Sequence, residues 1–264
     1  MPYFDNHGIK IYYEIEGEGP PVVMIHGFSG NLERKWKETN WVETLKHNYR
    51  LILLDCRGHG KSDKPHGDSY YGQKMTDDVI KLMEHLSIEK ANFFGYSMGA
   101  HIIFQILLTK PEIIICAILG GFVLTLNDKQ ISKDIERTKR IIEAFRAESI
   151  DQVKKPMARA FRMVAELREN DLLALAAVQA GWLKDWYETM TSPAQMRGSL
   201  KKIKVPVMTV VGSTELLPGD KTLIAQLVPD ACHFQIQGKD HLTATSDPKF
   251  HMVVKAFLDF VNNQ

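Results

Sequence analysis

A serine flanked by small residues, in the segment GYSMGA over residues 95–100, constrains the fold of this 264-residue chain more than any other feature. The apolar run 91–94 precedes this segment, and a helical pattern of apolar residues begins at His101. This order predicts a strand that turns abruptly into a helix, with Ser97 at the turn and small residues where strand and helix nearly touch. The hydroxyl of Ser97 would then be exposed beside the N-terminal N–H groups of the helix, which makes Ser97 a candidate nucleophile.

Short apolar runs recur along the rest of the chain and end in glycine or polar turn residues. The expected strands cover residues 9–15, 22–25, 51–54, 92–94, 113–119, 207–211 and 234–236. Helical patterns lie between several of these strands, for example over residues 77–85 and 100–108. Runs that are apolar on both faces are typical of strands buried between two layers of helices. The alternation therefore predicts an α/β protein with a mostly parallel sheet.

One long interval, from about residue 122 to about residue 204, interrupts this alternation. It has no strand pattern, and apolar residues recur there at spacings of three and four. The expected helices cover residues 134–146, 152–169, 171–180 and 183–190. Eighty residues are too many for a crossover loop, so we expect a separate helical layer over the carboxyl edge of the sheet, where open α/β sheets bind ligands.

A nucleophilic serine needs N–H donors for the oxyanion that forms when it attacks a carbonyl group. The amide of Met98, directly after the serine, is one expected donor. The loop HGFSG over residues 26–30 follows the strand 22–25, and we expect the amide of Phe28 to be the second donor.

Four segments taken together resemble the α/β-hydrolase fold family: HGF at residues 26–28, DCRGHGKS at 55–62, GYSMG at 95–99 and KDH at 239–241. The resemblance implies an α/β-hydrolase fold with an eight-stranded, mostly parallel sheet and helices on both faces. It implies a core domain of residues 1–121 and 205–264, with a helical cap of residues 122–204 inserted after the sixth strand. It also implies that His241, after the last strand, is the base that serves Ser97.

The acid that supports the histidine is less clear, because the family typically has Gly-x-x-Asp-x-x-Pro after the strand that follows the cap. Here the segment reads GSTELLP over residues 212–218, so Glu215 stands at the acid position. Glutamate can orient a histidine as aspartate does, although its extra methylene requires a different approach. Asp220 and Asp128 remain alternatives.

Other residues with chemical potential are expected to be structural. His26 is expected to brace the loop 26–30, and His59 and His101 to pack inside the fold. The GKS at residues 60–62 lacks the first glycine of a phosphate-binding loop, since residue 55 is aspartate. Asp240, His241 and His233 lack a tetrahedral ligand set, so no metal and no cofactor are expected.

The bulk properties favour a cytoplasmic protein that acts on small molecules. Lys and Arg number 33 and Asp and Glu number 32, so nothing suggests nucleic-acid binding. The N-terminal residues do not resemble a signal peptide, and no apolar run is long enough to span a membrane. Cys56, Cys116 and Cys232 are expected to be reduced and buried. We expect a monomer or a homodimer.

The expected chemistry is acyl transfer from a small-molecule ester, with His241 taking the proton of Ser97 and water later releasing the acyl group. Large apolar residues in and before the cap are expected to line an apolar substrate pocket. They are Phe122, Phe145, Phe161, Trp182 and Trp186. The carboxylesterase interpretation leaves open an enol-lactonase, a carbon–carbon bond hydrolase, a perhydrolase or a slow-turnover ligand receptor. A serine nucleophile argues against haloalkane dehalogenases and epoxide hydrolases, which use aspartate.

Overall fold

Eight strands form a single sheet in the order β1-β2-β4-β3-β5-β6-β7-β8 in the computed structural model, which describes residues 3–189 and 192–263, without the side chains of residues 186–189. The strands are β1 (Tyr3–Asn6), β2 (Ile9–Glu16), β3 (Pro21–Ile25), β4 (Arg50–Leu54), β5 (Ala91–Tyr96), β6 (Ile114–Gly120), β7 (Val207–Gly212) and β8 (Cys232–Ile236). Strands β3 to β8 pair in parallel, and β2 pairs antiparallel with both β1 and β4. The predicted mostly parallel, eight-stranded α/β sheet is confirmed. Strand β1 was not expected, because its four residues carry no apolar run.

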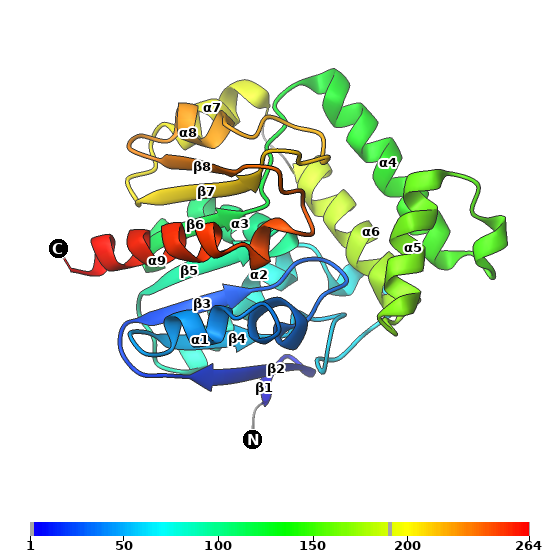
Figure 1. Ribbon diagram of the computed structural model, residues 1–264. Helices are drawn as coiled ribbons and strands as arrows, with labels where there is room; N and C mark the ends of the chain where they lie inside the picture. The colour runs from blue at the N-terminus through cyan, green and yellow to red at the C-terminus, as the bar shows by residue number, and fades with distance from the viewer. Residues whose placement is uncertain (1–2, 190–191, 264) are drawn as a thin grey trace.

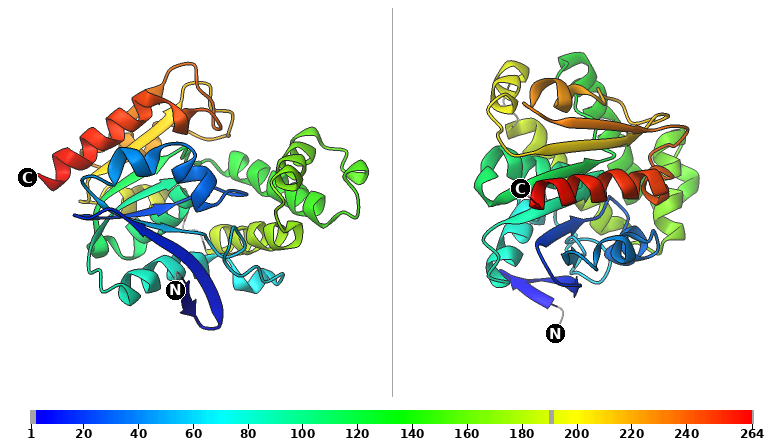
Figure 2. Two further views of the ribbon diagram at one scale, coloured as in Figure 1. Left: turned by 60° about the horizontal axis from the view of Figure 1, so that its bottom comes forward. Right: turned by 60° about the vertical axis from the view of Figure 1, so that its left-hand side comes forward.

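Helices cover both faces of the sheet (Figures 1 and 2). The helices are α1 (Trp41–Leu45), α2 (Gln73–His85), α3 (Met98–Thr109), α4 (Asp128–Arg146), α5 (Pro156–Leu167), α6 (Leu172–Thr189), α7 (Pro193–Leu200), α8 (Leu223–Leu227) and α9 (Pro248–Asn262). The shorter turns are η1 (Glu33–Lys37), η2 (Asp68–Tyr70), η3 (Pro111–Ile113), η4 (Ile150–Gln152) and η5 (Ala244–Ser246).

Alternate strand residues enter two separate cores, because successive side chains of a strand point to opposite faces. Val23 and Ile25 of β3 pack with α2 and α3 on one face. Val22 and Met24 pack with α1 and α9 on the other. Burial on both faces explains why these strands read as continuous apolar runs rather than alternating ones.

The chain order of the strands reverses at β3, which lies between β4 and β5. The loops that leave the carboxyl ends of β3 and β5 therefore diverge, and a crevice opens between them. This crevice is where the loop 26–30 and the turn at Ser97 meet.

Helices α4, α5 and α6 lie together at one side of the sheet, beyond the carboxyl ends of its strands (Figure 1). They share a small core of their own, which includes Ile141, Phe145 and Leu175. The buried guanidinium of Arg162 on α5 donates to the carbonyl oxygens of Ala144 and Ala147, each at 2.6 Å, and so closes the C-terminal end of α4.

The last helix of the expected insertion, α7, belongs with the sheet rather than with this group. Its Met196 and Leu200 are buried in the core that also contains α2 and α3, and Figure 1 shows α7 beside α8. We use the word cap below for the group of helices α4, α5 and α6; the domain bounds expected from the sequence stay a prediction.

Two helices were expected over residues 171–180 and 183–190, but residues 172–189 form the single helix α6, which continues through Gly181. A Cβ atom at Gly181 would lie 2.6 Å from Cβ of Tyr71 and 2.9 Å from the carbonyl oxygen of Asp68. Glycine is needed there because α6 approaches the backbone around η2 closely. It does not end the helix.

Cys56 and Cys116 are buried as expected, but Cys232 is exposed, so the expectation of three buried thiols is wrong for this residue. Cys232 begins β8, which pairs on one side only because it is the edge strand of the sheet. Among the residues described, no helix is both long enough and apolar enough to cross a membrane.

Candidate active site

Ser97 occupies a strained turn between β5 and α3, with φ 53° and ψ −112°. A Cβ atom at Gly95 would lie 2.4 Å from the carbonyl carbon of Gly99, and one at Gly99 would lie 2.0 Å from the carbonyl oxygen of Ile25. Only glycine fits at these two positions, because strand and helix are in backbone contact. The amide of Ser97 donates to the carbonyl oxygen of Gly120 at 2.8 Å, which fixes the turn to the neighbouring strand.

Three predicted side chains from separate loops form one chain of hydrogen bonds. Nε2 of His241 lies 3.0 Å from Oγ of Ser97, and Nδ1 of His241 lies 2.7 Å from Oε2 of Glu215. An ionised carboxylate can only accept, so Nδ1 carries the hydrogen and Nε2 is left to accept the proton of the serine hydroxyl. This arrangement is what a serine nucleophile and its base require.

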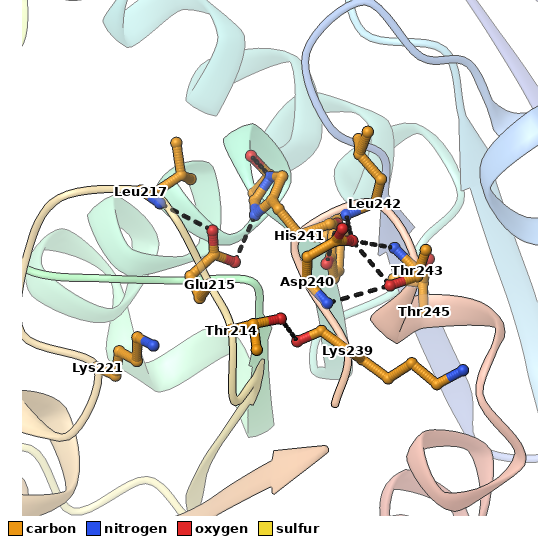
Figure 3. A network of polar contacts seen from close by, with 12 residues as sticks. Thr214, Glu215, Leu217, Lys221, Lys239, Asp240, His241, Leu242, Thr243 and Thr245 are labelled. Atoms are coloured by element: carbon orange, nitrogen blue, oxygen red, sulfur yellow. Dashed lines mark hydrogen bonds and ion pairs between the residues drawn. The ribbon is translucent and has the colours of Figure 1, made fainter. Parts of the chain in front are cut away.

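Glu215 is well placed to remain ionised. Its side chain is fully buried, and its Oε1 accepts a hydrogen bond of 3.0 Å from the amide of Leu217. Burial raises the pKa of Glu215, but the hydrogen bond and charge of His241 and the amides of Leu217 and Leu216 outweigh burial, so that the pKa lies below its ordinary value. Figure 3 shows the carboxylate between the imidazole and the amide of Leu217.

The two alternative acids make other contacts. Oδ1 of Asp220 accepts from the amide and hydroxyl of Thr222, both at 2.8 Å. Asp128 is exposed at the first turn of α4. Of the three candidates, Glu215 is the one that accepts a hydrogen bond from His241.

The loop that carries His241 is ordered by its own side chains. Oδ1 of Asp240 accepts from the amides of Leu242 and Thr243, each at 2.9 Å, and from the Thr243 hydroxyl at 2.7 Å (Figure 3). The hydroxyl of Tyr96 donates to the carbonyl oxygen of His241 at 2.6 Å, and the two rings lie 5.3 Å apart.

Lys35 completes this support from the opposite loop, with Nζ 4.1 Å from the centre of the Tyr96 ring. Burial, with a smaller contribution from the charge of Arg168, lowers the pKa of Lys35 to about 8. The roles of Tyr96 and Lys35 were missed, because nothing in the sequence shows that the ammonium, the phenol ring and the His241 loop come together.

The residues of the two expected oxyanion donors, Phe28 and Met98, lie close to Ser97. Phe28, Met98 and Ser97 line one cavity, and a Cβ atom at Gly27 would lie 3.3 Å from Cβ of Ser97. Neither the Phe28 amide nor the Met98 amide donates to a protein acceptor in the part of the chain that the structure describes. The oxyanion role of the two amides stays a prediction.

Buried histidines brace the loop after β3. In His26, Nδ1 lies 2.8 Å from the Gly27 carbonyl oxygen and Nε2 accepts from the Cys56 amide at 3.0 Å. Burial lowers the pKa of His26 to about 4, that of His59 to about 3 and that of His101 to about 4. The charge of His26 contributes at His59, and that of His241 contributes at His101. All three rings are therefore neutral at pH 7. His26 and His59 are fully buried, whereas His101 also lines the cavity that contains Ser97.

A cavity of about 220 Å³ opens above Ser97, between the sheet and the cap. Its apolar lining includes two of the five expected aromatic residues, Phe161 and Trp182. Its polar lining was not expected: besides Ser97 and His101, it includes Thr125, Asp134, Arg137 and Thr138 before and on α4 and Gln179 of α6. The cavity is therefore not the purely apolar pocket that the sequence suggested.

Two expected pocket residues do not line this cavity. Phe122 is 1% exposed and packs against His101 and Phe104, with ring centres 4.7 and 5.1 Å away. Phe145 is likewise 1% exposed and belongs to the core of the cap. Assigning them to the pocket was wrong, because a helical spacing of aromatic residues does not tell which ones fill the cap itself. The side chain of Trp186 lies outside the described residues.

No group of three or more His, Cys, Asp or Glu side chains that could hold a metal ion occurs within residues 3–185 and 192–263.

Comparison with known proteins agrees with this architecture. Residues 20–190 match the sequence profile of a family described as the alpha/beta hydrolase fold. A candidate 2-succinyl-6-hydroxy-2,4-cyclohexadiene-1-carboxylate synthase of Bacillus subtilis is 32% identical over 107 residues, which span 39% of this chain but only 38% of that relative.

Solved structures match along nearly the whole chain. An enol-lactonase from Burkholderia xenovorans LB400 has a TM-score of 0.76 at 24% identity, covering 97% of this chain and 99% of that one. A thermophilic esterase from Thermogutta terrifontis has a TM-score of 0.74 at 21% identity, covering 98% and 97%. At these identities the likeness establishes the fold.

Proposed function

Because the chain belongs to the α/β-hydrolase family, we propose that it is a serine hydrolase that cleaves carboxylic esters of small molecules through an acyl-enzyme on Ser97. The observation that carries the proposal is the continuous hydrogen-bond chain from Ser97 through His241 to the buried Glu215. The fold supports a hydrolase in general, and the ester as substrate is our inference from the nucleophile and its surroundings.

Acylation begins when the Ser97 oxygen attacks the ester carbonyl carbon while Nε2 of His241 takes the hydroxyl proton. The carbonyl oxygen becomes an oxyanion, which the amides of Phe28 and Met98 stabilise. Each such donor typically lowers the barrier by about 3 kcal/mol. The imidazolium formed is stabilised by Glu215, and it passes its proton to the departing alcohol as the carbon–oxygen bond breaks.

Deacylation repeats these steps with water as the nucleophile. His241 removes a proton from the water, the hydroxyl attacks the acyl carbon, and the proton then returns to the Ser97 oxygen as the acid leaves. The two steps together consume one ester and one water, release the alcohol and the acid, and return Ser97, His241 and Glu215 to their starting states.

The test combines labelling with turnover. We expect a fluorophosphonate probe to label Ser97 and the protein to hydrolyse p-nitrophenyl acetate and butyrate continuously. The variant Ser97→Ala should lose both labelling and hydrolysis while its circular dichroism spectrum and thermal unfolding stay unchanged. Undiminished hydrolysis by Ser97→Ala would show that the nucleophile is another residue.

Other acyl-transfer reactions can use the same group of residues. Labelling with negligible turnover of every ester in a panel would favour a ligand receptor. Faster opening of an enol-lactone than of open-chain esters would favour an enol-lactonase, and oxidation dependent on hydrogen peroxide and a carboxylic acid would favour a perhydrolase. Cleavage of a carbon–carbon bond next to a ketone would favour a carbon–carbon hydrolase.

A further inference from the structure

The cavity above Ser97 adjoins a groove on the cap, between α4 and the start of α5. The two spaces share three lining residues, Arg137, Ile141 and Met157. These three side chains therefore face both spaces and form the boundary between them.

The groove combines an apolar floor with a positively charged rim. Ile141, Pro156, Met157 and Ala158 provide apolar surface. The charged lining residues are Lys129, Lys133, Arg137, Arg140, Lys155 and Glu136. Five cationic side chains and one carboxylate thus line the groove, and the carboxylate of Glu136 is already paired with Arg140 at 3.0 Å.

Arg137 is the only one of these cations that also lines the cavity. Its side chain is 29% exposed, and NH1 lies 3.5 Å from Oδ1 of Asp134, a long contact for an ion pair. The same oxygen of Asp134 accepts a hydrogen bond of 3.1 Å from Gln130. A guanidinium has five N–H donors, so Asp134 leaves most of them available to a ligand.

From this geometry we propose that the preferred substrate is an ester with a carboxylate at the end remote from the scissile bond, and that Arg137 binds this carboxylate. This proposal rests on the ester hydrolase function proposed above for Ser97. Arginine binds a carboxylate through two parallel hydrogen bonds, and the lysines on the rim attract the anion toward the groove. A chain of methylene groups fits the apolar lining between the two ends.

We propose a carboxylate, with one negative charge, rather than a phosphate dianion as the group that Arg137 binds. Asp134 is buried next to Arg137, and its carboxylate repels a phosphate dianion more strongly than a monoanion. A carboxylate on an apolar chain also matches the lining better than a compact, strongly hydrated anion.

The test compares two methyl esters of nearly the same shape. Monomethyl suberate ends in a carboxylate, and methyl suberamate ends in a neutral amide. We expect wild-type protein to prefer the carboxylate ester in kcat/KM by roughly tenfold, as a partly exposed charge-assisted pair allows. Methanol release gives both rates. Added sodium chloride should lower this preference, because the groove is open to solvent.

Three variants on α4 distinguish the specific contribution of Arg137 from the general effect of removing a positive charge. Arg137→Gln should reduce the preference to near unity, and Lys133→Gln, on the rim, should reduce it less. Lys139→Gln removes the same charge from α4, but Lys139 is exposed and lines neither space. It should therefore keep the wild-type preference and the wild-type rates.

A wild-type protein that hydrolyses both esters equally would overturn the carboxylate proposal and leave the ester hydrolase intact. A preference that survives in Arg137→Gln would overturn the role of Arg137. If wild type hydrolyses neither these esters nor the p-nitrophenyl esters, the proposed function fails. Calorimetric titration of Ser97→Ala with the two esters then still decides whether the site favours the carboxylate, because binding does not need Ser97 chemistry.

Discussion

Replacing Glu215 with glutamine tests the catalytic geometry most directly, because the change keeps the size of the side chain and removes its charge. In the native protein one carboxylate oxygen accepts from Nδ1 of His241 at 2.7 Å, and the other accepts from the amide of Leu217 at 3.0 Å. Both partners donate. A glutamine side chain offers one acceptor oxygen and one donor NH₂ group, so it cannot satisfy both.

Either orientation of the glutamine side chain disrupts the hydrogen bonds that Glu215 makes. If its oxygen faces His241, its NH₂ group meets the Leu217 amide, donor against donor, in a fully buried place. If it is turned over, its NH₂ group donates to Nδ1, which forces the hydrogen of the imidazole onto Nε2. The imidazole then cannot take the Ser97 proton.

The loss follows from these contacts. In a triad of this kind, removing the charge of the acid lowers kcat by roughly 10³- to 10⁴-fold, which corresponds to about 4 to 5 kcal/mol in the barrier. Glu215→Asp keeps the charge but withdraws it by about one carbon–carbon bond, ~1.5 Å, so we expect a smaller loss than for Glu215→Gln.

The assay is kcat for p-nitrophenyl butyrate together with the rate of fluorophosphonate labelling at Ser97. Asp220→Asn is the matched control, because Asp220 hydrogen-bonds to Thr222 and not to His241, and it should retain wild-type values in both measurements. The reasoning is refuted if Glu215→Gln keeps more than about a tenth of the wild-type kcat, or if Asp220→Asn is the variant that loses activity.

Two further predictions concern the scaffold. Gly99→Ala should lower the free energy of unfolding by more than about 3 kcal/mol in urea titration, because the new methyl group would lie 2.0 Å from a backbone oxygen that cannot move away. Gly198→Ala, in α7, is the control, because a Cβ atom there has no neighbour within 4 Å. It should raise the free energy of unfolding by about 0.5–1 kcal/mol. A similar decrease in the free energy of unfolding in both variants would contradict the close-approach argument. Burial holds the pKa of His26 at about 4 and that of His59 at about 3, so below pH 6.5 the unfolded chain binds protons that the folded chain does not. The free energy of unfolding should therefore fall by about 2 kcal/mol per histidine between pH 7 and pH 5, and a free energy of unfolding that is flat over this range would show that these two histidines titrate in the folded protein.

Local sequence patterns were sufficient to predict the fold class and Ser97 as the candidate nucleophile. These patterns, namely the apolar runs, the glycines at the Ser97 turn and the order of the motifs, can be read along the chain. At Gly95 and Gly99 the backbone contact leaves no other residue type possible. The strand–turn–helix pattern predicted Ser97, whereas His241 and the acid position of Glu215 were implied by the resemblance to the α/β-hydrolase family; the three residues each follow a strand whose carboxyl end reaches the same edge of the sheet. The choice of Glu215 over Asp220 and Asp128 needed the distances.

Only the tertiary structure could decide how side chains of the cap are divided between its own core and the cavity. Phe145 and Phe161 both lie in amphipathic cap helices, yet one is fully buried in the cap and the other faces the cavity. Their spacing along a helix is the same kind of signal in both cases, and what differs is which neighbouring helix covers them. Arg137 is the clearest example. In the sequence it is one charge among many on a helix, and it becomes a group that a substrate can meet only because α4 crosses the cavity above Ser97.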